Sequence, residues 1–424
     1  MSLPHRLSLL AVVVLALLGG SATPASALRL GAMDPAYSTL QPRLFDADVR
    51  LLRPQVLRTN LLWTEIAPTR PRRPRNPGDA AYRWDMADYI VRRADAAGVP
   101  ILVTIWQTPS WAYGTRVRSI VGMPDVRAFR DFVAAAAERY SGSFDPDGPT
   151  GGLEPLPRVS QWQIWNEPNV YFYPQREPAG PRGRIVNARN YVRLLNAGHD
   201  EIKAVGRQHR FDQVVVAAGL AGARGRLLPY APLRFLRLMR AYRPRFDVLA
   251  VHPYNVAPWL GAQEGVAGRV TRAPNLAIGN IGDVLREVDR LWPRRRVPVW
   301  LTEFGLQTQP SRRGVSPGAQ ARFLADSLRI LRRYPRIGVA IWFLVKDQPL
   351  ARPGQHHTWQ SGLRFADGRR KPVFDVWRRA QISRKVPVPG RAPEPKPRSP
   401  VAPSPPIVPT PTDPPAPDVA SSAR

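Results

Sequence analysis

Two short apolar runs in this chain each lead to a single glutamate. The first begins at Gln161 and stops at Asn166-Glu167-Pro168, and the second runs from Val297 to Glu303, just before Phe304 and a glycine. The glutamates are 303 − 167 = 136 residues apart, about three strand-plus-helix units at roughly 30 to 45 residues each. Although Asn-Glu-Pro alone is equally typical of a helix start, the recurrence predicts the α/β class and a (β/α)8 TIM barrel, with glutamates ending strands four and seven.

Apolar runs of strand length recur along the whole middle of the chain. The predicted strands are 28–33, 55–60, 99–105, 161–165, 213–219, 246–254, 297–305 and 337–343. Apolar residues with helical spacing lie between most of them, at 41–53, 84–94, 125–140, 190–205, 233–242 and 317–334. No helix is assigned between 255 and 296. Together these runs predict one barrel domain over residues 28–382.

The two ends of the chain differ from this middle part. His5 and Arg6 precede an apolar run and a small-residue segment ending at Ala25-Ser26-Ala27, which is typical of a cleaved signal peptide over 1–27. The apolar run is shorter than the roughly 20 residues that span a bilayer, so no stable membrane insertion is expected after cleavage. Residues 383–424 are rich in proline, which predicts a disordered tail. A bacterial protein that is secreted or held at the cell surface is expected.

Charge and cysteine content restrict the partners. The chain of 424 residues has a formal net charge of +30 and no cysteine, so no disulfide or thiolate metal site holds the fold. Its arginines are scattered through every predicted helix and loop rather than gathered in one patch, and an exported protein rarely meets nucleic acid, so no nucleic-acid partner is expected. The charge instead favours anionic cell-wall or polysaccharide surfaces.

Three motifs carry a resemblance to a known group of enzymes. Trp165-Asn166-Glu167-Pro168, Thr302-Glu303-Phe304-Gly305 and Pro109-Ser110-Trp111-Ala112 resemble glycoside hydrolase clan A, the retaining (β/α)8 glycosidases. Within the clan they are most similar to family 39 and its bacterial exopolysaccharide-degrading relatives, over about residues 28–380. The resemblance implies that Glu167 is the acid/base and Glu303 the nucleophile.

The resemblance also implies partners for the nucleophile. Arg58, on the second predicted strand with Asn60 beside it, matches an arginine that contacts the nucleophile in clan A. At the end of the sixth strand, Tyr254 matches a tyrosine that donates to the nucleophile, and His252 lies beside it. Without the resemblance, a surface arginine and a packed His-Pro-Tyr would be the ordinary interpretations.

Sugar contacts are expected from an amide and several aromatic rings. The resemblance implies that Asn166 holds the sugar 2-hydroxyl and that Trp342, on the eighth strand, lies under the sugar. Trp106 and Trp111 follow the third strand, where aromatic rings stack on sugars or simply pack the loop. Many clan A enzymes carry a histidine near this strand end, whereas this chain has Trp106-Gln107, so the sugar contacts differ there.

The function implied by the resemblance is hydrolysis of O-glycosidic bonds, β-linked, in an oligo- or polysaccharide. Two carboxyl groups suffice for this reaction, so carbohydrate is the expected partner and no metal or organic cofactor is predicted. Transfer to another sugar stays open as an alternative, because water and sugar acceptors use the same base. A non-catalytic glycan-binding or cell-surface protein on a barrel scaffold is the other alternative.

Overall fold

A computed structural model of the chain describes residues 28–36, 42–148, 152, 154–177, 183–222, 230–254, 276–311, 314–350 and 358–382. The predicted signal peptide (1–27) and the predicted tail (383–424) lie outside the described residues. Over the described ranges, none of the helices is both long and apolar enough to span a membrane.

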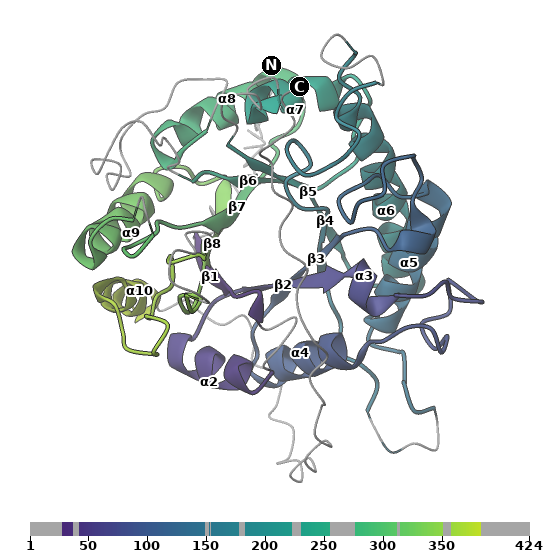
Figure 1. Ribbon diagram of the computed structural model, residues 1–424, viewed down its shortest axis with the longest axis horizontal. Helices are drawn as coiled ribbons and strands as arrows, with labels where there is room; N and C mark the ends of the chain where they lie inside the picture. The colour runs from purple at the N-terminus through teal and green to yellow at the C-terminus, as the bar shows by residue number, and fades with distance from the viewer. Residues whose placement is uncertain are drawn as a thin grey trace, which may run out of the picture.

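Eight parallel strands close into a barrel in sequence order, with β1 paired to β8 (Figure 1). The strands are β1 (Arg29–Met33), β2 (Leu57–Leu62), β3 (Ile101–Trp106), β4 (Gln161–Ile164), β5 (Val214–Ala221), β6 (Val248–His252), β7 (Val299–Phe304) and β8 (Ile337–Phe343). The helices are α2 (Pro42–Leu52), α3 (Trp63–Ile66), α4 (Asp85–Ala96), α5 (Val126–Arg139), α6 (Asn187–Gln208), α7 (Pro232–Arg240), α8 (Ile281–Leu291), α9 (Pro317–Leu331) and α10 (Pro372–Ile382). Short 3-10 turns are η1 (Ser110–Ala112) and η5 (Ile278–Asn280). The predicted (β/α)8 barrel is confirmed.

The helices α3 and α10 were not assigned from the sequence, and neither was α8. It buries Ile281, Val284, Leu285 and Val288, which recur at three- and four-residue intervals and so form one apolar stripe. The helical pattern is present in the sequence, but it lies far beyond the sixth strand, so its place in the βα alternation was missed. α8 supplies the helix between β6 and β7 that a barrel requires.

Alternation along each strand separates two apolar layers. On β6, Val248 and Ala250 belong to the cluster inside the barrel, whereas Leu249 and Val251 join the larger cluster between strands and helices. This follows from the two-residue period of a strand, which points successive side chains to opposite faces. The inner cluster fills the barrel below its carboxyl end, so polar side chains at the strand ends have an apolar floor.

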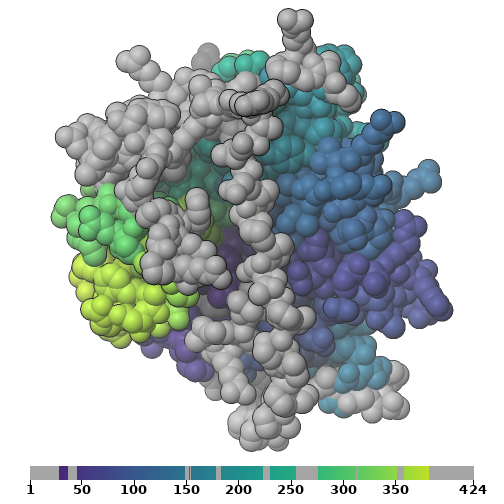
Figure 2. Space-filling view, in the orientation of Figure 1, coloured from purple at the N-terminus to yellow at the C-terminus, as the bar shows by residue number. Residues whose placement is uncertain are grey.

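The last helix closes the barrel against the first. The indole N–H of Trp377 on α10 donates to the carbonyl of Leu52 at the end of α2 (3.1 Å), and Arg378 donates to the carbonyl of Leu51 (2.6 Å). In the space-filling view, the purple and blue segments cover one side of the molecule and the green and yellow segments the other (Figure 2). Segments distant in sequence thus complete one ring.

Candidate active site

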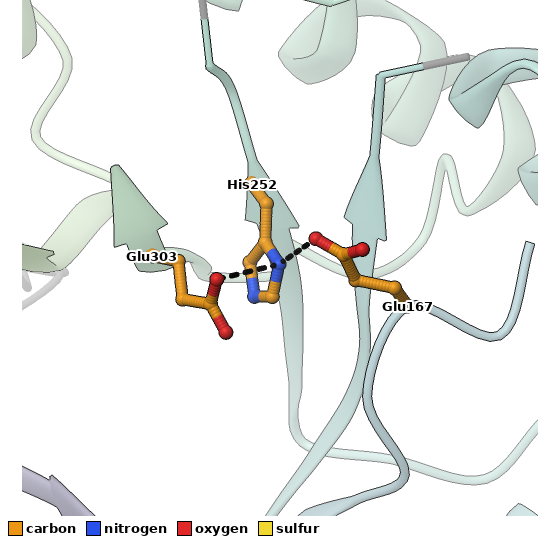
Figure 3. Close-up of side chains that lie close together, drawn as sticks. All are labelled: Glu167, His252 and Glu303. Carbon is orange, nitrogen blue, oxygen red and sulfur yellow. Dashed lines mark hydrogen bonds and ion pairs between the residues drawn. The ribbon is translucent and has the colours of Figure 1, made fainter. Parts of the chain in front are cut away.

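The two glutamates singled out in the sequence lie together at the carboxyl end of the barrel. Glu167 follows β4 and Glu303 belongs to β7, and His252 at the end of β6 lies between them (Figure 3). One oxygen of each carboxylate and a ring nitrogen of His252 all lie within 4.8 Å of one another. The side chains of Glu167 and Glu303 are 13% and 9% exposed, so both remain open to a ligand.

An unusual backbone conformation aims Glu167. Trp165 and Glu167 have φ angles of 67° and 47°, in the left-handed region that side chains other than glycine rarely adopt. The buried ring of Trp165 donates its N–H to the carbonyl of Tyr171 (2.8 Å), and the backbone N–H groups of Val170 and Tyr171 donate to the carbonyl of Glu167 (2.9 and 2.8 Å). These bonds hold a strained turn, which is common at functional sites. The predicted strand therefore stops at Ile164, earlier than its apolar run.

A register shift in β7 positions Glu303. The pairing of β7 with β8 is irregular between Leu301 and Phe304. Through this irregularity, Thr302 and Glu303, although consecutive, both reach partners at the site: Thr302 contacts His252, and Glu303 accepts a hydrogen bond from the Tyr254 hydroxyl at 3.0 Å. A bulge commonly re-aims a side chain near an active site in this way.

Arg58 on β2 binds the other side of Glu303. It forms an ion pair with Glu303 and is 1% exposed. Its remaining N–H groups donate to the hydroxyl of Thr104 (2.8 Å), the side-chain oxygen of Asn166 (2.8 Å) and the carbonyl of Thr302 (3.1 Å). Because the planar guanidinium is held by several acceptors, its charge has a fixed position beside Glu303.

His252 connects the two carboxylates. Its Nδ1 lies 2.7 Å from Glu167 and 3.6 Å from Glu303, and its Nε2 lies 3.0 Å from the hydroxyl of Thr302. The ring is fully buried. A histidine held at both nitrogens is fixed in orientation, so it keeps Glu167 at a defined distance from Glu303.

The surroundings move the two carboxyl pKa values in opposite directions. Burial raises the pKa of Glu167, and the negative charge of Glu303 adds to this, against the opposing effect of His252. Burial also acts to raise the pKa of Glu303, but the electrostatic influence of His252, the positive charge of Arg58 and the hydrogen bonds from Arg58 and Tyr254 outweigh it and lower the pKa. Glu167 is thus suited to carry a proton and Glu303 to stay ionised.

The same three side chains also meet the spacing of a metal site. However, Arg58 already pairs with one oxygen of Glu303, and the Tyr254 hydroxyl donates to the other. A divalent cation bound to Glu303 would face the guanidinium at close range, and like charges repel strongly in a site of low exposure. The donor set therefore fits a charge-paired carboxylate better than a metal ligand.

Asn60 and Trp106, two residues singled out in the sequence, carry polar atoms without a partner in the part of the chain that the structure describes. The side-chain oxygen of Asn60 and the indole nitrogen of Trp106 are buried without a hydrogen-bond partner among the described residues. They lie on adjacent strands, because Asn60 pairs with Thr104 and Leu62 with Trp106. Buried polar groups are normally satisfied, so this acceptor and this donor have unused hydrogen-bonding capacity.

Two other predicted contacts are engaged in packing. Trp111 donates its indole N–H to the carbonyl of Ala67 (2.8 Å) and packs edge-on against Trp63 (5.5 Å between ring centroids). Trp342 is fully buried and packs on Phe304 and on Phe323 of α9. Trp342 therefore faces outward from the barrel. The expectation that it lies under the sugar is wrong, because the inward residue that ends β8 is its neighbour, Phe343.

The sequence analysis missed three supporting residues. Thr104 hydrogen-bonds Arg58, and Thr302 hydrogen-bonds His252. Both point into the barrel from β3 and β7, which the two-residue period of the strands could have predicted. Trp359 packs against Tyr254 (5.7 Å) and Phe343 (5.3 Å). No local pattern marks Trp359, since only the closed barrel brings its loop to the end of β6.

Fold and site together define a (β/α)8 barrel with paired strand-end carboxylates. No protein-family model and no curated protein sequence matches the chain. Among solved structures, a family 39 glycoside hydrolase from Bacteroides cellulosilyticus WH2 has a TM-score of 0.55 at 18% identity, over 84% of this chain and 64% of that chain. A monomeric β-xylosidase from Caulobacter crescentus CB15 has a TM-score of 0.57 at 18% identity, over 84% of this chain and 68% of that chain.

A GH5_18 protein from Streptomyces cattleya, solved in complex with GlcNAc, is also similar, with a TM-score of 0.56 at 16% identity over 86% of this chain and 82% of that chain. These structures confirm the (β/α)8 fold that the resemblance to clan A and family 39 implied. This chain spans 64% of the length of the family 39 glycoside hydrolase and 68% of the length of the β-xylosidase.

Proposed function

We propose that this chain is a secreted retaining glycoside hydrolase that cleaves β-linked O-glycosidic bonds in an oligo- or polysaccharide. The observation that supports this most is the approach of the two carboxylates, an oxygen of each lying within 4.8 Å of the other. Retaining glycosidases place their carboxyl groups about 5–5.5 Å apart, whereas inverting enzymes leave room for a water molecule at roughly 6.5–9.5 Å. The opposite pKa shifts of Glu167 and Glu303 fit the division of labour.

In the first step, the ionised Glu303 attacks the anomeric carbon. The bond from that carbon to the glycosidic oxygen breaks, and Glu167 gives its proton to the departing oxygen. A covalent ester between the sugar and Glu303 remains. Arg58 and the Tyr254 hydroxyl stabilise the negative charge of Glu303 before the attack. They stabilise the carboxylate again when the ester breaks.

In the second step, Glu167 acts as a base. Having lost its proton, it takes one from water, whose oxygen attacks the anomeric carbon while Glu303 departs as a carboxylate. The loss of charge on Glu303 in the ester removes the repulsion that raised the pKa of Glu167, so the pKa falls when a base is needed. His252, 2.7 Å from Glu167, keeps the carboxylate in place through both steps.

Sugar recognition is assigned to groups around this pair. The side-chain oxygen of Asn166 accepts from Arg58 (2.8 Å), which leaves its amide N–H groups directed to a sugar hydroxyl. The unpartnered atoms of Asn60 and Trp106 supply a further acceptor and donor. A site that binds hydroxyls through such buried atoms discriminates strongly against analogues that lack those hydroxyls.

Mass spectrometry of the intact protein tests the proposal. Activated 2-fluoro glycosides of several sugars are incubated with wild type and with Glu303→Gln, and any adduct is mapped by peptide analysis. One adduct per chain on Glu303, absent in Glu303→Gln, is expected. An adduct on another carboxylate would refute the assigned roles, and no adduct with any sugar of the panel would contradict the proposed activity.

Glu167 is tested separately. Glu167→Ala is expected to form the Glu303 adduct with an aryl glycoside whose leaving group needs no proton, and to release it slowly because no base activates water. Azide, which needs no base, should speed that release and yield a glycosyl azide. Release at the wild-type rate without azide would show that Glu167 is not the base.

A further inference from the structure

An exposed aromatic ring stands next to the acid/base. Tyr171 is 48% exposed, more than any other aromatic side chain among the described residues. It lies four residues after Glu167, and its backbone N–H donates to the carbonyl of that residue (2.8 Å). Single exposed rings are common on protein surfaces, so the exposure of Tyr171 alone does not indicate a binding site. Its position and its fixed backbone are what distinguish it.

The backbone around Tyr171 is fixed on both sides. Its carbonyl accepts from the buried indole of Trp165 (2.8 Å), and the carbonyl of Val170 accepts from Gln175 (2.8 Å). Its two neighbours, Val170 and Phe172, are buried at 5% and 0% exposure. A ring held out between two buried neighbours loses little conformational freedom when a ligand covers it.

The loop that follows β3 holds this segment from outside. The N–H of Tyr173 donates to the carbonyl of Val121 (3.0 Å), and the N–H of Met123 donates to the carbonyl of Tyr173 (2.7 Å). Tyr171 is thus carried by two loops tied together at the barrel mouth. The backbone that carries the ring is therefore fixed before a ligand binds.

The hydroxyl of Tyr171 responds to the two carboxylates of the site. Partial burial, and after it the influence of Glu167, Tyr173 and Glu303, raise the pKa of Tyr171 to about 12. The hydroxyl therefore stays protonated wherever a two-carboxylate enzyme works, and it can donate a hydrogen bond.

We propose that Tyr171 stacks on the sugar at the leaving-group side of the scissile bond, so that the substrate carries a ring sugar there. This inference rests on the proposed glycosidase function. Glu303 bonds to the sugar that stays, whereas Glu167 protonates the oxygen of the sugar that leaves, so the segment that carries Glu167 borders the leaving group. A sugar ring exposes C–H groups on its face, and an aromatic face is electron-rich, so the two pack well.

The same position binds the acceptor in the second step. A hydroxyl of an acceptor sugar attacks the anomeric carbon, its proton passes to Glu167, and the bond to Glu303 breaks to release the carboxylate. A sugar stacked on Tyr171 holds its hydroxyl near that carbon. Tyr171 therefore also favours sugar over water as the acceptor.

Reactivation of the trapped enzyme tests this inference. The 2-fluoroglycosyl adduct on Glu303 is freed of reagent and incubated with buffer, glycerol, xylobiose or cellobiose, and recovery of free protein is followed by mass. Each acceptor-dependent rate is divided by the rate of the same variant in buffer. We expect disaccharides to speed recovery of wild type, and the acceptor concentration for half-maximal effect to rise by about tenfold in Tyr171→Ala.

Three comparisons sharpen the test. Tyr171→Phe should behave like wild type, because it keeps the stacking face. Tyr242→Ala removes a ring of similar exposure, 42%, in the connection between α7 and β6, and should not change acceptor use. Glycerol, which has no ring face, should act equally on wild type and Tyr171→Ala.

The outcomes separate the inference from the function on which it rests. If the adduct forms but disaccharides act equally on wild type and Tyr171→Ala, or do not speed recovery at all, the role of Tyr171 is refuted and the glycosidase stands. An equal loss in Tyr242→Ala would refute it as well. If no adduct forms in wild type, the proposed glycosidase is overturned, and this inference with it.

Discussion

Replacing Tyr254 with phenylalanine removes the hydroxyl that donates to Glu303 at 3.0 Å. This hydrogen bond stabilises the charged form of the carboxylate, so its loss raises the pKa of Glu303. Because Glu303 has to be ionised to attack, the acidic limb of the pH profile of kcat/KM should move to higher pH. The alkaline limb reports the proton on Glu167. Because the Tyr254 hydroxyl donates to Glu303 and not to Glu167, this limb should stay in place.

The size of the shift follows from the strength of one hydrogen bond to a charged group. Such a bond contributes about 1.5–3 kcal/mol, and about 1.36 kcal/mol corresponds to one pKa unit. Since Glu303 is 9% exposed, water replaces part of the lost interaction, and we expect a shift of about one unit. The remaining charge of Arg58 keeps the pKa from rising further.

The assay is the pH dependence of labelling by the 2-fluoro glycoside that reacts with wild type, since the labelling rate requires the same ionised Glu303. Tyr89→Phe is the matched control. It removes a hydroxyl that also donates to a carboxylate, that of Asp46 (3.1 Å), but away from the site. An acidic limb that stays in place, or moves to lower pH, in Tyr254→Phe would refute the reasoning, as would an equal shift in Tyr89→Phe.

Three further predictions concern metal, backbone strain and a buried ion pair. EDTA should leave labelling of Glu303 unchanged, and a loss restored by a divalent ion would contradict this. Arg243 is exposed after α7 with φ 53°, so Arg243→Gly should make the protein about 0.5–1 kcal/mol more stable. Arg294→Gly, at a position outside the left-handed region, should destabilise it. Chemical denaturation measures the stability of both variants. Lys371→Met should lower the free energy of unfolding by about 3–5 kcal/mol, because it leaves the buried Asp347 without its ion-pair partner. Adding Asp347→Leu should restore part of this stability. No recovery would argue against an unpaired charge as the cause.

Most of the barrel follows from local sequence patterns, because each strand and helix carries its own period. All eight strands lie where apolar runs predicted them, and β8 (Ile337–Phe343) matches residue by residue. The end of β4 was placed too late, since Trp165 continues the apolar run while its backbone turns left-handed at φ 67°. That turn depends on bonds to the carbonyls of Ile105 and Tyr171, which no local pattern shows.

The site divides in the same way. Glu167, Glu303, Arg58 and Tyr254 could be named from strand ends and the family resemblance, and the structure brings them together. Trp342 could not be placed, because its direction depends on one residue of register at the end of β8, and a slip of one residue exchanges the inner and outer faces. The packing of Trp359 on Tyr254 likewise needs the tertiary structure.

The opposite pKa shifts of Glu167 and Glu303 originate in their neighbours rather than in the glutamate motifs. An oxygen of each carboxylate lies within 4.8 Å of the other, so the charge of one disfavours the charge of the other. Arg58 pairs with Glu303, whereas its effect on the pKa of Glu167 is smaller than the effects of burial, His252 and Glu303, so Arg58 favours Glu303 as the ionised partner. A guanidinium on β2, 167 − 58 = 109 residues before Glu167 and 245 residues before Glu303, thus helps to set the direction of the proposed reaction.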